Sequence, residues 1–195
     1  MHFTSAFAAT LLALTSSAVV AATPLSTRKD APALAPWQLT SLSFFSPSGR
    51  PGSYPWSTLT ANITDPNVLT LGTNPDTNTP VTVPAGNTAA NCQAKWFAYD
   101  TPFGRKWPCD ASPSGYWYME VVQTDQFSFS NYKVKFTRVA EVLVGGAAYR
   151  GVWEGQALFR VGTELSGTCG GSGVCSSGLK SELRPFAIKQ KKKAE

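Results

Sequence analysis

The chain has 195 residues with 17 basic and 12 acidic side chains, a net charge of +5, and a single histidine, His2. His2 lies in a segment that is expected to be removed during export, so the exported chain is expected to have no imidazole side chain. This excludes Ser-His-Asp and Cys-His hydrolases, histidine-containing zinc or copper sites, and ribonucleases with a histidine acid or base. A carboxylate pair, as in glycoside hydrolases, is the catalytic option that remains.

Residues 1–22 are predicted to be a signal peptide. Residues 6–22 form an apolar run, and Val20-Ala21-Ala22 offers small residues for cleavage. A membrane anchor is the alternative interpretation, but the run is short and rich in Ala, Ser and Thr. We therefore expect a secreted, extracellular protein with no membrane span.

The exported chain is predicted to have three parts. Residues 23–35, rich in Pro and Ala, are expected to be a disordered leader, residues 36–188 a single domain, and residues 189–195 a solvated basic tail. The leader contributes +1 and the tail +3 to the net charge of +5, which leaves +1 for the residues between them. Since nothing else resembles a nucleic-acid-binding motif, we expect no nucleic-acid partner.

Alternating apolar and polar residues predict strands at the start of the domain. The first covers residues 36–45, with a change of parity or a bulge before Leu42, and the second covers residues 56–63. Asn62, in Asn62-Ile63-Thr64, is the one N-glycosylation acceptor that the sequence offers. Residues 65–91 are dense in Pro, Asn and Thr, so we expect a long loop or edge, with short strands at 68–71 and 81–83 at most.

A strong strand is predicted at residues 115–122, where alternation separates two faces. Trp117, Met119 and Val121 should face the core, while Tyr116, Tyr118 and Glu120 should face outward. Shorter alternating runs at 127–130 and 132–136 predict two more strands.

Gly145-Gly146 lies between two further runs, 139–144 and 147–161, and predicts a hairpin because glycines accept the positive φ of a primed turn. Residues 165–177 are interpreted as a Gly/Ser-rich loop, and 183–189 as a last strand. With no helical stripe anywhere, the pattern predicts an all-β fold, a single antiparallel β-barrel or β-sandwich.

The four cysteines, Cys92, Cys109, Cys169 and Cys175, lie in the exported part. An even number in a secreted chain predicts two disulfides. Three pairings are possible, and the pairing of sequence neighbours, Cys92–Cys109 and Cys169–Cys175, is the natural choice. The first bridge would enclose a wide, aromatic-rich hairpin at residues 91–109 and stabilise the fold by about 3 kcal/mol.

Several short pieces resemble the Alternaria major-allergen-like family of small secreted fungal β-barrel proteins in order and spacing. They are Trp37-x-Leu39-x-x-Leu42, Ser57-x-Leu59-x-x-Asn62-Ile63, Cys92-x-Ala94, Lys106-Trp107-x-Cys109 and the pair Cys169 and Cys175. The resemblance implies a β-barrel with two intrachain disulfides, no established catalytic centre, and an exported effector, elicitor or allergen that engages host-plant components. The family's additional cysteine, which links two subunits, is absent, so we expect a monomer or a non-covalent dimer.

The first functional hypothesis is a secreted, non-enzymatic protein, of the effector or elicitor type active in virulence, that binds a host plant apoplastic protein or wall component. Trp, Tyr and Arg dominate binding energy at interfaces. The residues expected to be exposed are Tyr99, Tyr116 and Tyr118, together with the basic residues Arg105 and Lys106 in the loop. No catalytic residue, metal or cofactor is expected.

Two alternatives remain open. One is a small β-sandwich glycoside hydrolase that uses Glu154 or Glu164 together with Asp100 or Glu120 as acid and nucleophile. The other is a carbohydrate- or small-phenolic-binding module that uses the barrel interior or an aromatic platform.

Overall fold

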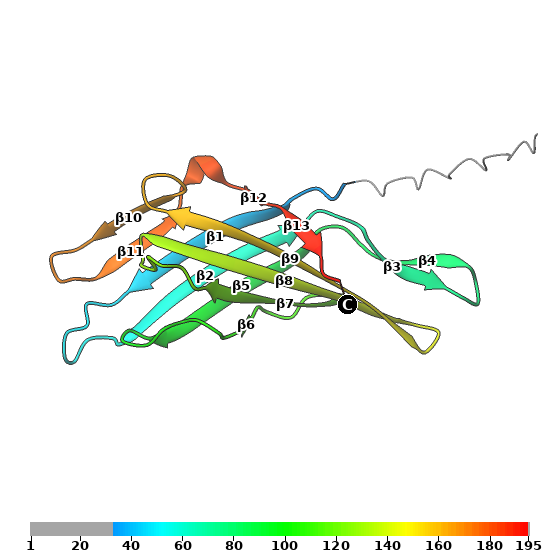
Figure 1. Ribbon diagram of the computed structural model, residues 1–195, viewed down its shortest axis with the longest axis horizontal. Coiled ribbons are helices and arrows are strands. Elements are labelled where there is room, and N and C mark those ends of the chain that lie inside the picture. Colours follow the sequence, from blue (N-terminus) through cyan, green and yellow to red (C-terminus); the bar gives the residue numbers. More distant parts are fainter. Residues whose placement is uncertain (1–32, 195) are drawn as a thin grey trace, which may run out of the picture. The chain divides into compact units, whose positions relative to one another are not determined.

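A computed structural model describes residues 33–194, coloured in Figure 1. The predicted signal peptide and residues 23–32 of the predicted leader lie outside the described residues. Within residues 33–194 the chain forms β-strands and one short 3-10 helix, η1 (Ser181–Leu183), which confirms the all-β prediction. The strands make two main antiparallel sheets and one separate hairpin.

The first sheet has the strand order β10-β11-β1-β2-β5, and β12 also pairs with β1. Its strands are β1 (Trp37–Ser46), β2 (Trp56–Asp65), β5 (Asn87–Phe97), β10 (Leu165–Cys169), β11 (Cys175–Leu179) and β12 (Phe186–Ile188). The predicted irregularity in β1 is present, because its register against β2 shifts between Leu39 and Ser41. This shift keeps both Leu39 and Leu42 in the core.

The second sheet has the order β13-β9-β8-β7-β6. Its strands are β6 (Trp107–Pro108), β7 (Gly115–Val122), β8 (Asn131–Val144), β9 (Ala147–Arg160) and β13 (Gln190–Lys192). The predicted Gly-Gly hairpin is confirmed: Val144 pairs with Ala147, and both glycines have positive φ. The two faces predicted for β7 are confirmed as well, since Trp117, Met119 and Val121 are buried.

Two segments predicted mainly as loops contain hairpins. In residues 65–91 the short strands expected at 68–71 and 81–83 are present and longer, as β3 (Leu69–Asn74) and β4 (Thr79–Val83), and buried Leu69 and Val83 anchor their ends. Residues 165–177 pair as β10 and β11, with Cys169 opposite Cys175. Small side chains suffice in the second hairpin because β1 supplies a hydrogen-bonding partner for β11.

One predicted strand and one predicted hairpin are also wrong in their form. Residues 127–130 make a reversal, in which the backbone N–H groups of Ser128 and Asn131 donate to each other's carbonyl oxygens. Local hydrogen bonding by serine hydroxyls favours such turns over a strand. Residues 91–109 are not a hairpin within one sheet, because β5 pairs with β2 whereas β6 pairs with β7.

The Cys92–Cys109 disulfide therefore joins the edges of the two sheets. The backbone N–H of Asp110, next to Cys109, donates to the carbonyl of Ala90 at 2.9 Å and so links the same two edges. The second disulfide, Cys169–Cys175, closes the β10–β11 hairpin, so both predicted pairings are confirmed.

The opposite edges are joined by the chain itself. β12 pairs with β1 in the first sheet, and two residues later β13 pairs with β9 in the second. Gly155 in β9 permits this crossing, since a Cβ there would lie 3.0 Å from Ile188 and 3.1 Å from Trp37. The expected division into a domain ending at residue 188 and a free tail is wrong, because residues 190–192 belong to the sheet.

The core between the sheets is rich in aromatic rings that meet edge to face or at a tilt. Trp37 of the first sheet and Trp117 of the second meet edge to face, with ring centroids 4.7 Å apart. Phe44 lies against Trp96 and Tyr132, at 5.5 and 5.2 Å. Such contacts stabilise beyond the area that they bury.

A buried ion pair crosses the core at the end of β2. Arg138 of β8 donates to the carboxylate of Asp65, and their side chains are 1 % and 0 % exposed. The same carboxylate accepts the backbone N–H of Asn67 at 2.9 Å and its side-chain amide at 2.7 Å. The Arg138 guanidinium also lies 5.7 Å from the Trp117 ring. The pair connects the two sheets through fully buried charges.

Removing one partner of this pair should destabilise the fold because the other charge is left buried and unpaired. We expect Arg138→Met to lower the free energy of unfolding in urea by about 3 to 5 kcal/mol. Arg150→Met is the control, since Arg150 and Glu141 are 51 % and 44 % exposed and 3.8 Å apart, and it should cost about 1 kcal/mol or less. Equal losses in the two variants would contradict the assigned role.

The two disulfides should differ in their effect on stability. Cys92 and Cys109 are 17 residues apart and Cys169 and Cys175 are 6 apart, so the first closes the longer loop of the unfolded chain. Replacing the first pair by alanine should cost about 3 kcal/mol, and replacing the second about 2 kcal/mol. Denaturation of both double variants measures this, and the reverse ranking would contradict the dependence on loop length.

Candidate functional site

The structure brings three of the five predicted binding residues together. Tyr116 and Tyr118 project outward from β7, and the Lys106 ammonium lies 5.0 Å from the Tyr118 ring centroid. Arg105 precedes Lys106 in an exposed loop. Tyr99 lies elsewhere, beyond the end of β5 in the first sheet, where its hydroxyl donates to the Gly49 carbonyl. The residues predicted as one surface therefore belong to two.

Tyr116 and Tyr118 line a groove of roughly 860 Å³ on the outer face of the second sheet, here called the β7–β9 groove. Its lining residues are Lys106, Tyr116, Tyr118, Val139, Ala148, Arg150, Val152, Lys193 and Ala194. The strand register explains the arrangement, because Tyr116 lies opposite Val139, which in turn lies opposite Val152. The floor is thus apolar, and the rim carries aromatic rings and cations.

Sequence reasoning missed Arg150 and Lys193 as groove residues. Arg150 faces outward by the alternation of β9, and its guanidinium approaches the Tyr116 hydroxyl at 3.4 Å. The backbone N–H of Lys193 donates to the carbonyl of Val152, which extends the β13 pairing and places Lys193 at the groove. The alternation of β9 could have indicated Arg150, but no local signal reveals the pairing of β13.

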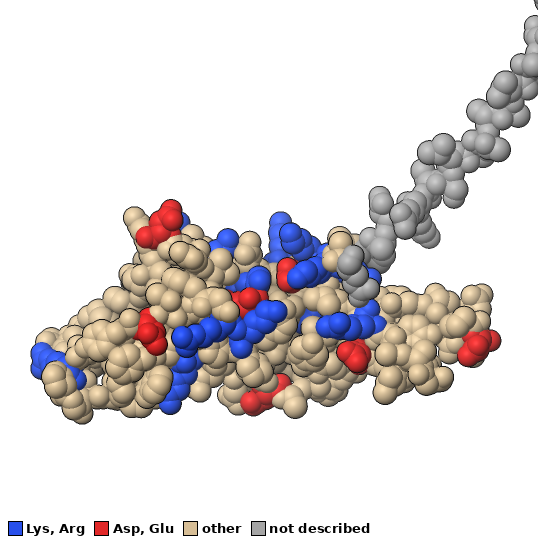
Figure 2. Space-filling model, turned by 60° about the horizontal axis from the view of Figure 1, so that its bottom comes forward, with Lys and Arg blue, Asp and Glu red and all other residues tan. Residues whose placement is uncertain are grey.

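A second hollow of roughly 350 Å³ continues the same face toward β13. Its lining residues are Lys135, Glu154, Gly155, Gln156, Lys189, Gln190 and Lys191. Figure 2 shows Lys and Arg side chains gathered across the middle of one face of the molecule, with single acidic side chains among them. The lysines expected in a solvated tail are therefore part of a structured surface.

The carboxylates considered for glycoside hydrolysis are engaged with other groups. Glu120 lies 2.6 Å from the Lys135 ammonium, and Glu154 lies 3.3 Å from that of Lys193. The carboxylate of Glu164 accepts the backbone N–H of Arg160 at 3.0 Å. Asp100 follows β5 in an exposed turn.

Tyr99 belongs to a separate group of exposed and half-buried rings, here called the Trp56 cluster: Phe45, Tyr54, Trp56, Phe97 and Tyr99. Trp56 and Phe97 meet edge to face at 5.9 Å, and both are 37 % exposed, while Tyr99 is 73 % exposed. The Lys95 ammonium lies over the Tyr54 and Trp56 rings. Alternation of β2 and β5 puts Trp56, Phe97 and Lys95 on the outer face of the first sheet.

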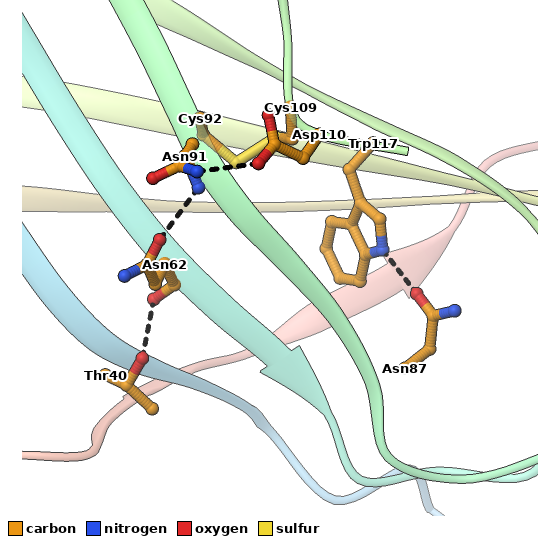
Figure 3. Close-up of a disulfide and its surroundings, with 8 residues drawn as sticks. All are labelled: Thr40, Asn62, Asn87, Asn91, Cys92, Cys109, Asp110 and Trp117. Atoms are coloured by element: carbon orange, nitrogen blue, oxygen red, sulfur yellow. Dashed lines mark hydrogen bonds between the residues drawn. A yellow bond between two sulfur atoms is a disulfide. The ribbon is translucent and has the colours of Figure 1, made fainter. Parts of the chain in front are cut away.

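Asn62, the predicted glycosylation acceptor, lies within β2 and faces outward, half-buried. Its side-chain oxygen accepts the backbone N–H of Asn91 at 2.9 Å, and its own carbonyl accepts the Thr40 hydroxyl (Figure 3). Asn91 in turn donates to Asp110 beside the disulfide. Asn62 thus helps to hold β5 against β2, and its glycosylation stays a prediction.

Within residues 33–194, no three His, Cys, Asp or Glu side chains are grouped so that they could hold a metal ion. The same range contains no helix that is long and apolar enough to cross a membrane.

Comparisons with protein-family models, with curated proteins and with solved structures found no match for this chain. Its function is therefore inferred below from its own residues.

Shifted pKa values occur on the outer face of the second sheet, at Lys135, and in the core, at Arg138 and Tyr132. Burial opposes the charge of Lys135, but the hydrogen bond and negative charge of Glu120 outweigh it and raise the pKa of Lys135. Burial lowers the pKa of Arg138, against the opposing effect of Asp65. In the core, burial raises the pKa of Tyr132, and the nearby Ser177 hydroxyl offsets this only in part.

The Tyr132 shift predicts alkaline sensitivity. Because folding raises the pKa of this phenol above its unfolded value of about 10, its contribution to stability is complete below about pH 10 and is lost as the pH rises further. We expect Tyr132→Phe to show a flatter decline in unfolding free energy between about pH 9 and 11 than the parent protein. Parallel curves would show that Tyr132 does not contribute.

Proposed function

We propose that this protein is a secreted, non-enzymatic binding protein of the effector or elicitor type, which acts by contact with a host plant component. The β7–β9 groove is the proposed contact surface. The observation that carries this proposal is the convergence of Tyr116, Tyr118, Lys106 and Arg150, from three separate chain segments, around one apolar floor. Aromatic and arginine side chains around a hollow are typical of the energetic centre of an interface.

Export is supported by both disulfides, since such bonds persist in oxidising compartments. The resemblance to the Alternaria major-allergen-like family supports a role at the plant surface. A binding role is favoured over glycoside hydrolysis because Glu120 and Glu154 are each held by a lysine instead of forming an acid and nucleophile pair.

A carbohydrate-binding module is the second candidate function, and the Trp56 cluster favours it. Exposed aromatic rings on the face of a sheet can stack on the apolar faces of sugars. Hydroxyl groups follow along the same outer face, including the pair Ser43 and Thr60, 2.6 Å apart. In this function Tyr99 is the ring most accessible to a ligand.

The two surfaces can be tested separately because they lie on different sheets. The double variant Tyr116→Ala/Tyr118→Ala should lose capture of its partner from plant apoplastic fluid by about tenfold or more, as expected when two interface aromatics are truncated. Tyr99→Ala is the matched control and should keep capture. Both rings are partly exposed, so unfolding curves should change by about 1 kcal/mol or less.

The opposite pattern would assign binding to the other surface. If Tyr99→Ala loses capture of wall polysaccharide while the double variant keeps it, the Trp56 cluster is the binding site. If neither variant affects the capture of any apoplastic component, the proposal of a contact function for the groove is wrong.

A further inference from the structure

The β7–β9 groove opens onto a surface on which cations outnumber acids. Besides Lys106 and Arg150, the pairing of β13 adds Lys189, Lys191 and Lys193 to the same face. Among the described residues, Lys106, Lys189 and Lys191 have no carboxylate within ion-pair distance. The surface therefore has positive charge that no acidic neighbour neutralises.

Docking of the C-terminal strand fixes the spacing of these charges. Lys191 lies opposite Glu154 in β9, which lies opposite Thr137 in β8, and Thr137 lies opposite Tyr118. One row across the sheet thus leads from Lys106 over Tyr118 to Lys191. Neighbouring strands are about 4.8 Å apart, so the three intervals from β7 to β13 span about 14 Å.

Three carboxylates lie among the cations. Glu120, Glu154 and Glu141 pair with Lys135, Lys193 and Arg150. They would repel a backbone as densely charged as that of duplex DNA, with about one charge per 1.7 Å. They can instead accept hydrogen bonds from hydroxyl groups. The surface is thus suited to a chain that combines well-spaced negative charges with many hydroxyl donors and with apolar faces that stack on tyrosine rings.

We propose that the β7–β9 groove and the adjoining β13 surface bind an acidic polysaccharide of the polyuronate class. Uronate carboxylates pair with Lys106, Arg150 and Lys191, sugar hydroxyls donate to the carboxylates between them, and sugar rings stack on Tyr116 and Tyr118. This inference rests on the proposed contact function and names the chemical class of the host component.

The test uses the full exported chain with purified polygalacturonate as the probe, followed by affinity electrophoresis or calorimetry. The same polymer with methyl-esterified carboxyls is the matched ligand, since it keeps the sugars and removes the charges. We expect unesterified polymer to bind at least about tenfold more tightly, and raising the salt from about 0.05 to 0.3 M to weaken binding several-fold.

The variant Lys106→Gln/Lys191→Gln should bind polygalacturonate about tenfold more weakly, because it removes two cations of the row. Arg160→Gln/Lys180→Gln removes the same charge outside both candidate surfaces and should bind like the parent protein. Equal weakening by both double variants would overturn the site. Equal binding of both polymers, absence of binding, or tighter binding of single-stranded DNA would overturn the ligand class.

These outcomes are distinguishable from failure of the proposed function. If polygalacturonate does not bind but Tyr116→Ala/Tyr118→Ala still abolishes capture of an apoplastic protein, the contact function stands and the polyuronate inference is wrong. If neither measurement depends on the groove, both are wrong.

Discussion

The buried pair of Asp65 and Arg138 is the interaction on which the arrangement of the two sheets depends. Charges this deeply buried are tolerated only when they are paired and hydrogen-bonded, so each residue constrains the position of the other. Asp65 terminates β2 and Arg138 lies in the middle of β8, so one contact sets the register between sheets that share no backbone ladder. Apolar packing alone would permit the sheets to slide, because it is not directional.

A polar network extends this constraint to the C-terminal crossing. Asn67 bonds to Asp65, and its amide also donates to the carbonyl of Ala35. That carbonyl accepts a further bond from the side chain of Gln190, the first residue of β13. The same Gln190 accepts the backbone N–H of Trp37 at 3.2 Å. The strand that carries the C-terminal lysines is therefore tied to the buried ion pair through a chain of hydrogen bonds.

The two sheets are joined along two edges, here called seams, and each seam positions lysines on the outer face of the second sheet. On one side the Cys92–Cys109 bridge and the Asn62–Asn91–Asp110 bonds hold the first sheet to the residues that directly follow β6 (Figure 3). This positions Lys106, two residues before the end of β6, next to Tyr118. On the other side β13 brings its lysines to β9. The groove lies between the seams, so covalent and backbone constraints flank the side chains that would meet a ligand.

Local pattern was sufficient for much of this protein. Alternation in β7 correctly predicted which side chains face the core, because side-chain direction in a strand depends only on parity. Gly145-Gly146 predicted the long hairpin, because both glycines accept the positive φ of the turn. The even number of cysteines and their order predicted both bridges. Tertiary structure alone decided which strands became neighbours. It paired β6 with β7 and not with β5, and it paired the small residues of β10 and β11. It also made the lysine-rich end of the domain into β13. Such pairings depend on backbone hydrogen bonds offered by strands distant in sequence, which leave no trace in local composition. For the same reason, Tyr99 and Tyr118 looked like members of one surface in the sequence and lie on opposite sheets in the fold.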